Sequence, residues 1–425
     1  MSTKIVAAPE KKMSDVSVQR RIIAYVLILA GYFLYCYNSS VLDYVKPFLS
    51  DYYNIGLEQS AVFYSYQTIG TVTGAFVCAW LAENWGKKKT LICITLLNGL
   101  ATVICLTYIE FHVWCGMRFL VGISLGGYYT AAVSSMVGLF SDKVRGMVTA
   151  IAYSMYSFSI IAIGAFAAMF KEAGWENLIW IGGIPPMIVA LLMVLLVPNE
   201  EKYKPFGNQA SGEAGTNTVV AKGTWREMFS KDYIKITVAI ILMAALNSIG
   251  FQFFSGFVTV YLREVRMFDA VTMGAIYSLS SFGNLVGAYA WGFLSDKFGR
   301  KFNAFGFFLS ALMVVFYFIS PSNMKLLALF GAIYNFGLAS TSIWGGYFTE
   351  LFPQRLRSMG ASLFHVAKIL SFMSPYVIVM IKNATSLTTA MWGAPIVFSI
   401  VGIIWLCQPE TNRKGIFYKG YVTKE

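Results

Sequence analysis

Charged residues are scarce in this chain. Asp, Glu, Lys and Arg together make up 13% of its 425 residues, compared with about a quarter of an average soluble domain. Histidine occurs only twice, so the sequence offers no cluster that would support a zinc or haem site. It also contains no catalytic constellation and no nucleotide-binding loop. We therefore expect neither an enzyme nor a bound cofactor or metal.

Paired cysteines and a cleavable leader are also missing. The six cysteines show no CxxC-type spacing and fall inside apolar stretches, where a thiol is usually a small packing residue. Residues 1–21 are polar and basic and lack the apolar region of a signal peptide. We expect the first apolar stretch itself to direct the chain to a membrane.

Apolar and aromatic residues are abundant instead, at 57% of the chain. They fall into about a dozen stretches of roughly 20 residues, each long enough to cross a hydrocarbon core about 30 Å thick as a helix. The sequence therefore predicts an all-α membrane protein with twelve transmembrane helices. The predicted spans are 22–44, 60–82, 90–109, 113–140, 147–170, 177–197, 234–261, 269–295, 302–320, 325–350, 358–381 and 388–407.

The net charge of +12 reflects topology, not affinity for nucleic acid. Most of the 33 Lys and Arg residues lie in the two terminal segments and in the even-numbered loops. Since basic residues accumulate on the cytoplasmic side, both termini are predicted to be cytoplasmic. We expect a monomer in a bacterial inner membrane, divided into a cytoplasmic segment (1–21), a first bundle (22–197), a cytoplasmic linker (198–232), a second bundle (233–407) and a cytoplasmic tail (408–425).

Two loop motifs indicate that the halves are repeats. Leu81–Lys89 after span two is matched by Gly292–Lys301 after span eight, and Gly86 and Gly299 are 213 residues apart. A second pair, Leu139–Met147 and Leu351–Met359, has an offset of 212 residues. A shared offset predicts two pseudo-symmetric six-helix bundles, an architecture typical of transporters.

At these residues the sequence resembles the major facilitator superfamily. The second loop fits its G-x-L-x-D-[RK]-x-G-[RK]-[RK] signature, whereas the first copy has Glu83 and Asn84 in place of an aspartate and a basic residue. The resemblance implies transport by alternating access. The glycines permit a tight turn, and the charged residues either form contacts that break when the cytoplasmic side opens or simply set topology. The candidate gating residues are Glu83, Gly86, Lys87, Lys88, Asp296, Gly299, Arg300, Lys301, Arg145 and Arg357.

Two basic residues lie inside predicted spans. Arg118 is in span four, where a cation costs at least about 2.5 kcal/mol on insertion scales; it either binds a substrate or pairs with backbone carbonyls. Its R-x-x-x-G context with Gly122 also resembles a signature of the superfamily. Lys368 is near the middle of span eleven and needs an anionic partner to keep its charge.

Acidic residues are absent from the middle of every predicted span, and Asp43 lies near the outer end of span one. The expected cavity therefore holds two cations and no resident anion. A small organic carboxylate is the natural substrate, because it would neutralise both. Polar and aromatic residues of the spans would complete the site. The candidates for substrate binding are Arg118, Lys368, Tyr35, Asn38, Tyr128, Gln252, Tyr334, Asn335 and Trp344.

Within the superfamily, the chain resembles the branch of aromatic-acid and sialate proton symporters. That branch carries D-G-Y-D in span one, whereas this chain has Tyr35-Cys36-Tyr37-Asn38. Proton-coupled symport and exchange of two organic anions both remain open. Proton relay candidates are Asp43 and His365, although His365 also fits a satisfied core residue. Drug efflux is less favoured, since span five lacks the proline of the antiporter motif.

Overall fold

A computed structural model gives the fold of the chain. It describes residues 13–53, 56–108, 110–140, 145–170, 174–199, 225–353, 356, 359–360, 363–364, 367–413 and 415–418, and the statements below concern these residues. Every regular element in these ranges is helical. The prediction of an all-α protein is confirmed.

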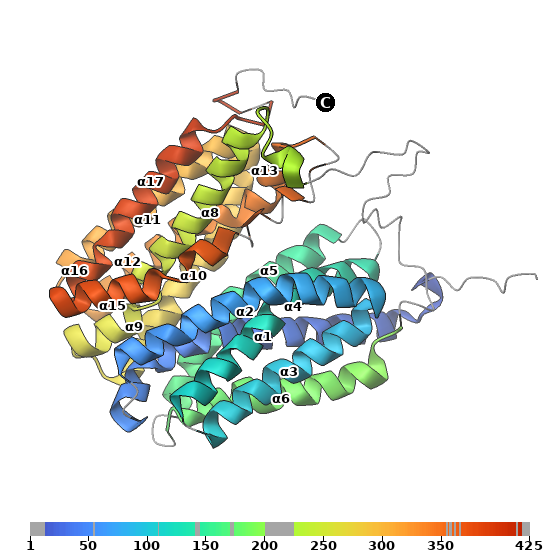
Figure 1. The fold of residues 1–425 in the computed structure, drawn as a ribbon, viewed down its shortest axis with the longest axis horizontal. Helices are drawn as coiled ribbons and strands as arrows, with labels where there is room; N and C mark the ends of the chain where they lie inside the picture. Colours follow the sequence, from blue (N-terminus) through green and yellow to red (C-terminus); the bar gives the residue numbers. More distant parts are fainter. Residues whose placement is uncertain are drawn as a thin grey trace, which may run out of the picture.

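Six long helices form the first half of the chain (Figure 1). After a short 3₁₀ turn, η1 (Met13–Asp15), they are α1 (Val18–Tyr53), α2 (Leu57–Asn84), α3 (Lys87–Thr107), α4 (Phe111–Gly138), α5 (Arg145–Met169) and α6 (Glu176–Leu196). Within this bundle α2 packs on α4, α3 packs on α6, and α1 contacts α5 and α6.

The second half repeats this arrangement with helices that are broken more often. After the short α7 (Trp225–Met228), its elements are α8 (Ile234–Phe254), α9 (Val258–Val260), η4 (Tyr261–Val265), α10 (Ala270–Phe298), η5 (Arg300–Ala304), α11 (Phe305–Ile319), α12 (Met324–Leu338), η6 (Ala339–Ile343), α13 (Trp344–Glu350), η8 (Lys368–Ser371), α15 (Ser374–Ala384), α16 (Leu387–Met391) and α17 (Gly393–Cys407). These segments correspond to spans seven to twelve, so the prediction of two six-helix bundles is confirmed.

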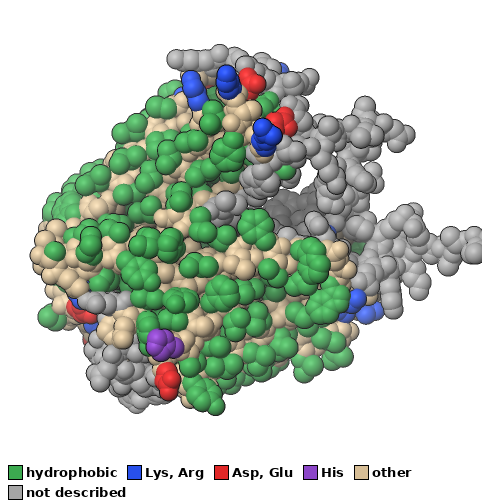
Figure 2. All heavy atoms as spheres, in the orientation of Figure 1, with side chains coloured by type: hydrophobic (Ala, Val, Ile, Leu, Met, Phe, Trp, Pro, Cys, Tyr) green, Lys and Arg blue, Asp and Glu red, His purple; other side chains and the backbone are tan. Residues whose placement is uncertain are grey.

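The outer surface suits a bilayer. Eight helical segments in the described part of the chain are long and apolar enough to cross a membrane. Figure 2 shows hydrophobic side chains along the flanks of both bundles, with charged side chains near the ends. The protein is an integral membrane protein.

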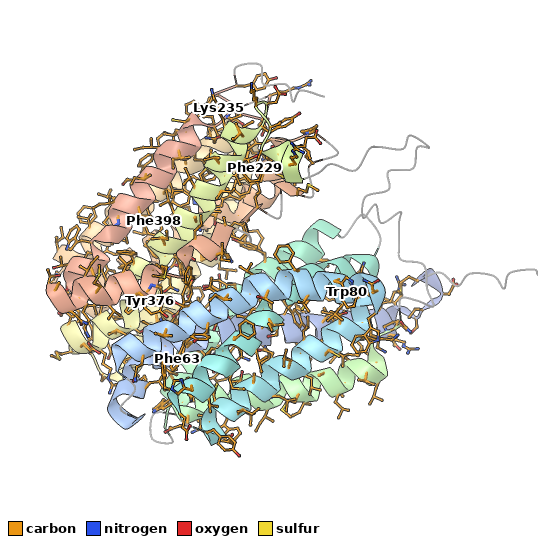
Figure 3. The ribbon with its side chains drawn as sticks, in the orientation of Figure 1. Phe63, Trp80, Phe229, Lys235, Tyr376 and Phe398 are labelled. Atoms are coloured by element: carbon orange, nitrogen blue, oxygen red, sulfur yellow. The ribbon has the colours of Figure 1, made fainter. Side chains whose placement is uncertain are left out.

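The bundles meet at one end and diverge toward the other (Figure 1). We call the end that carries α7 and α13 the linker end, and the opposite end, where α1 meets α9, the far end. Figure 3 labels Trp80 on α2 and Lys235 on α8 at the linker ends of the two bundles. Tyr376 lies on α15, which packs against α2 toward the far end.

Two turns at equivalent positions confirm the internal repeat. Gly86 precedes α3 with φ 97°, and Gly299 follows α10 with φ 107°. Both values lie in the region that favours glycine, as the loop motif predicts.

Glycines also bring helix backbones together. A Cβ atom added to Gly122 on α4 would lie 2.3 Å from the carbonyl oxygen of Gln67 on α2, and one on Gly74 would lie 2.1 Å from that of Ile123. In the second half, a Cβ on Gly283 of α10 would lie 1.7 Å from the carbonyl oxygen of Ala332 on α12. Such approaches are possible only without a side chain.

The helix of span one extends beyond the predicted outer end of the span. The sequence-based span ends at residue 44, near Asp43, but α1 continues through Pro47 to Tyr53. Asp43 and Lys46 are both buried, and the Lys46 ammonium lies 2.6 Å from the Asp43 carboxylate. Because the two charges compensate each other, they do not need to reach water.

Candidate functional site

Arg118 on α4 is a buried cation with unused hydrogen-bond donors. Its side chain is 0% exposed, and Nε, Nη1 and Nη2 have no hydrogen-bond partner among the described residues. The guanidinium lies 5.4 Å from the ring centre of Trp114, one turn earlier on the same helix. No backbone carbonyl in the described ranges accepts a hydrogen bond from Arg118, so these residues give no support to the alternative that it pairs with backbone carbonyls.

Lys46 is a further buried cation, which the sequence did not lead us to expect. Its ammonium bonds to Asp43 and also donates to the carbonyl oxygen of Gly256, at 2.8 Å. Asp43 is thus a buried carboxylate beside the break between α8 and α9, and the expectation of a cavity without a resident anion stays a prediction. A lysine three positions after an acid in an apolar stretch was the signal that could have identified the pair.

Positive charge still exceeds negative charge in this part of the molecule. Asp43 is engaged by Lys46 and lies within electrostatic range of Arg118. Lys368 is a third cation within the spans, and no acid of the described residues forms an ion pair with it. Around Asp43 the described residues thus place two cations, Lys46 and Arg118, beside one carboxylate.

Lys368 lies at a break in the eleventh span. It begins the 3₁₀ turn η8, which separates it from α15. Its ammonium lies 4.8 Å from the ring centre of Phe364, and its side chain is only partly buried. Its predicted neighbour His365 lies outside the described residues.

A pocket opens between the two halves of the chain. It is bordered by α5 on one side and by α8, α10 and α12 on the other, with Tyr334 and Asn335 from the predicted set among its lining residues. The Tyr334 hydroxyl lies 2.9 Å from that of Ser255. The pocket also includes residues that the sequence did not single out: Tyr156, Phe251, Phe254, Tyr277, Ser280, Ser281 and Tyr317. These residues contribute phenol, phenyl and hydroxyl groups to the lining.

Gln252 on α8 follows the pocket residue Phe251 in the chain, and its side chain is fully buried. Both of its amide atoms lack a hydrogen-bond partner among the described residues. Adding a Cβ to Gly256 would place it 1.9 Å from the Gln252 side-chain oxygen, so the amide lies against the break between α8 and α9. The amide is also close to the Tyr64 hydroxyl of α2.

Tyr35 and Tyr128 form part of an aromatic stack between α1 and α4. Their ring centres are 5.7 Å apart, and Tyr32 stacks on Tyr35 at 5.1 Å. Tyr35 remains partly exposed, whereas Tyr128 is buried and its hydroxyl donates to the carbonyl of Ile28 at 3.4 Å. Tyr35 is therefore the more accessible of these two rings.

Two predicted binding residues are directed into the bundle interiors. The Asn38 amide nitrogen donates to Asn98 at 3.1 Å and to the Gly182 carbonyl at 2.7 Å, which joins α1 to α3 and α6. Trp344 is 1% exposed and packs against Phe307 and Trp405 in the second bundle. Both residues thus make contacts within single bundles, and a role of either in substrate binding stays a prediction from the sequence.

The second signature loop forms a network within its own bundle at the linker end. Arg300 contacts Asp296 at 2.8 Å and Glu350 at 3.0 Å. The Glu410 carboxylate accepts hydrogen bonds from the backbone N–H groups of Arg300 and Lys301, each at 2.9 Å. Glu350 and Glu410 were missed as partners, although both are acids at the ends of apolar stretches.

The first signature loop is held differently. Lys88 donates to the carbonyls of Val194 and Val197 at the end of α6, at 2.9 and 2.7 Å. The side chains of Glu83 and Arg145, and all of Arg357, lie outside the described residues. The described contacts of both loops therefore stay within single bundles, and the predicted contacts between bundles remain a prediction.

Several proteins named as transporters are similar to this chain in sequence. The 4-hydroxybenzoate transporter PcaK of Acinetobacter baylyi is 24% identical over 76% of this chain and 77% of its own length. The sialic acid transporter NanX of Escherichia coli is 24% identical over 70% of this chain and 73% of its own. A putative niacin/nicotinamide transporter of Bacillus subtilis, NiaP, is 21% identical over 78% and 81%.

Solved structures share the fold. A bacterial homologue of the human lysosomal transporter Spinster, in an inward-facing and unoccupied conformation, has a TM-score of 0.71 at 15% identity and covers 92% of this chain and 97% of its own. The xylose transporter XylE of Escherichia coli has a TM-score of 0.68 at 14% identity, covering 93% and 98%. The model of the Major Facilitator Superfamily matches residues 28–375. The chain is a transporter that belongs to the Major Facilitator Superfamily.

Proposed function

We propose that this transporter moves a small organic anion, a carboxylate, across the membrane by alternating access. The observation that carries the proposal is Arg118, a fully buried guanidinium whose three nitrogens have no hydrogen-bond partner among the described residues. An uncompensated charge in a low-dielectric interior is costly. A carboxylate would satisfy a guanidinium with two parallel hydrogen bonds.

The names of the relatives support this substrate class. PcaK is described as a transporter of 4-hydroxybenzoate, NanX as a transporter of sialic acid and NiaP as a transporter of niacin or nicotinamide. Most of these compounds combine a carboxylate with a ring. Arg118 and Lys368 would bind the carboxylate of the substrate, either at the same time or one after the other. The rest of the substrate would contact Gln252, Tyr334, Asn335, Tyr35 and Tyr128.

We further propose the orientation that the basic residues predict. The linker end faces the cytoplasm of a bacterium, the far end faces outward, and residues 1–21, 198–232 and 408–425 are cytoplasmic. The structure then corresponds to a carrier closed on its outer side, with a monomer as the working unit. The charged loop residues at the linker end would form contacts between bundles in the opposite state.

For energy coupling we propose symport with a proton. Asp43 and Lys368 are titratable groups of the described spans, and His365 is a further candidate from the sequence. Exchange of organic anions is the alternative, favoured by the absence of an acid at Asn38 in the first span.

A thermal-shift series on the purified protein tests the substrate class. Benzoate, nicotinate and aliphatic mono- and dicarboxylates are compared with benzamide and nicotinamide, which keep the ring but lack the charge. A ligand at 100 times its dissociation constant stabilises by about 2.7 kcal/mol. We expect stabilisation by at least one carboxylate and none by its amide.

Matched variants show whether the two cations are responsible. Arg118→Gln and Lys368→Gln should each abolish the shift, whereas Lys325→Gln, which alters an exposed lysine at the start of α12, should preserve it. A shift that is unchanged in the Arg118→Gln, Lys368→Gln double variant would reject the assignment.

A further inference from the structure

The charged pair on α1 is also a contact between the two halves of the transporter. The Lys46 side chain is 1% exposed. Among the described residues its ammonium contacts the Asp43 carboxylate at 2.6 Å, the Gly256 carbonyl oxygen at 2.8 Å and the ring of Phe257 at 5.0 Å. Asp43 belongs to the same helix as Lys46. Gly256 and Phe257 belong to the second half, in the break between α8 and α9.

Two neighbouring hydrogen bonds join the same elements. The Thr259 hydroxyl on α9 donates to the backbone carbonyl of Asp43. The Tyr44 hydroxyl donates to the carbonyl of Ala270, at the start of α10, at 3.0 Å. A single turn of α1 therefore makes these three contacts with the second half, and of the three the Lys46 contact carries a full charge.

These contacts lie at the far end, where the bundles meet. Opening this end must separate α1 from the α8–α9 break. The Asp43–Lys46 pair can stay intact during this movement, since both residues move with α1. The bond to Gly256 and the contact with Phe257 have to break.

We propose that Lys46 is a positioning residue that keeps the far end of the transporter closed by bonding to the Gly256 carbonyl. Asp43 holds the ammonium in place and compensates its charge, so that the cation can be buried at the junction. A hydrogen bond to a charged donor is stronger than one between neutral groups. The bond therefore favours the closed far end over the open one. The inference requires alternating access but no particular substrate.

A buried reporter cysteine can measure this opening in purified protein. Ser65 on α2 is 1% exposed, and its hydroxyl donates to the Phe372 carbonyl of the second half at 2.5 Å. In a variant without native cysteines, Ser65→Cys should react with a maleimide only when the far end opens. Ser310→Cys, 0% exposed inside the second bundle, serves as the control for unfolding.

Two variants distinguish the effect of the Asp43–Lys46 ion pair from that of the Lys46 contact with Gly256 in the second half. Lys46→Met removes both, whereas the exchange Asp43→Lys, Lys46→Asp keeps a charged pair but takes the ammonium away from Gly256. We expect both to raise the labelling rate at position 65 about tenfold or more, as fits the loss of a bond to a charged group. Lys46→Arg should restore a slow rate. Labelling at position 310 should stay slow throughout.

Three results would overturn the proposal. One is an unchanged rate at position 65 in both variants while position 310 stays protected. Another is a rise in Lys46→Met with a normal rate in the exchanged pair, since the ion pair alone would then explain the effect. The third is a rise of the same size in the exposed-site control Lys325→Met. If Lys46→Met does not fold, the exchanged pair and Asp43→Asn, Lys46→Met provide the same test.

Discussion

Arg300 and Glu350 are joined by two hydrogen bonds, from Nη2 at 3.0 Å and from Nε at 3.2 Å, at the linker end of the second bundle. This paired geometry matches the planar guanidinium to the carboxylate. It ties the turn after α10 to the end of α13. The Thr411 hydroxyl binds the same carboxylate, which brings in the segment after α17.

Arg300→Lys should therefore destabilise the second bundle. A lysine cannot form the paired bonds, and because the two side chains are 21% and 35% exposed, we expect a modest loss of about 1 kcal/mol. Thermal unfolding in detergent measures it, with Lys325→Arg as the control. Equal unfolding temperatures for wild type and Arg300→Lys at low salt would contradict this prediction.

Gly299→Ala should cost more than an ordinary glycine substitution. The backbone at Gly299 has a φ of 107°. A residue with a side chain is strained in this conformation, at a cost of about 1–3 kcal/mol in folding free energy. The added Cβ would also lie 2.6 Å from the Glu410 carboxylate. Gly116→Ala on α4 is the matched control, because its Cβ would meet nothing within 4 Å. A smaller loss at position 299 than at position 116 would count against the role of this turn.

Arg118→Gln should raise the stability of the empty protein while abolishing carboxylate binding. Removing a buried charge without a hydrogen-bond partner relieves its desolvation cost. The same change removes the group that would bind the carboxylate. Unfolding temperatures with and without the carboxylate found by the ligand series measure both effects. A variant that is less stable than wild type and still shifts with ligand would refute the assignment of Arg118.

Uptake into proteoliposomes should distinguish the two modes of energy coupling. Under symport, a pH gradient with the acidic side outside drives accumulation in vesicles without internal anion. Under exchange, uptake requires preloaded anion and ignores the gradient. We expect the first result. Uptake that depends on preloading alone would reject symport.

The sequence predicted the fold better than the site because the two depend on different signals. Twelve spans follow from composition, and the turns at Gly86 and Gly299 follow from a motif whose backbone only glycine adopts readily. The orientation of a polar residue within a span is harder to predict. In a membrane both the lipid-facing and the core-facing sides of a helix are apolar. The sequence therefore did not indicate that Asn38 and Trp344 pack inside single bundles. Nor did it indicate that Tyr156 and Tyr277 line the pocket.

The burial of charge at the far end was not predicted for a related reason. An acid near the end of an apolar stretch is normally taken to mark the membrane surface, so Asp43 was placed there. The partner that allows it to be buried, Lys46, was excluded by the same assumption. The contact with Gly256, 210 residues further along the chain, is tertiary and could not be read from local sequence.

The glycine contacts between α2 and α4 limit how this transporter can change shape. At those positions one backbone rests directly on another, so there are no side-chain rotamers through which the helices could slide past each other. The two helices should move as one rigid body, and the displacement between states must be taken up where α2 meets α15 and where α1 meets α9. Spin labels on α2 and α4 should report a constant distance in every state, while a pair on α2 and α15 should report two.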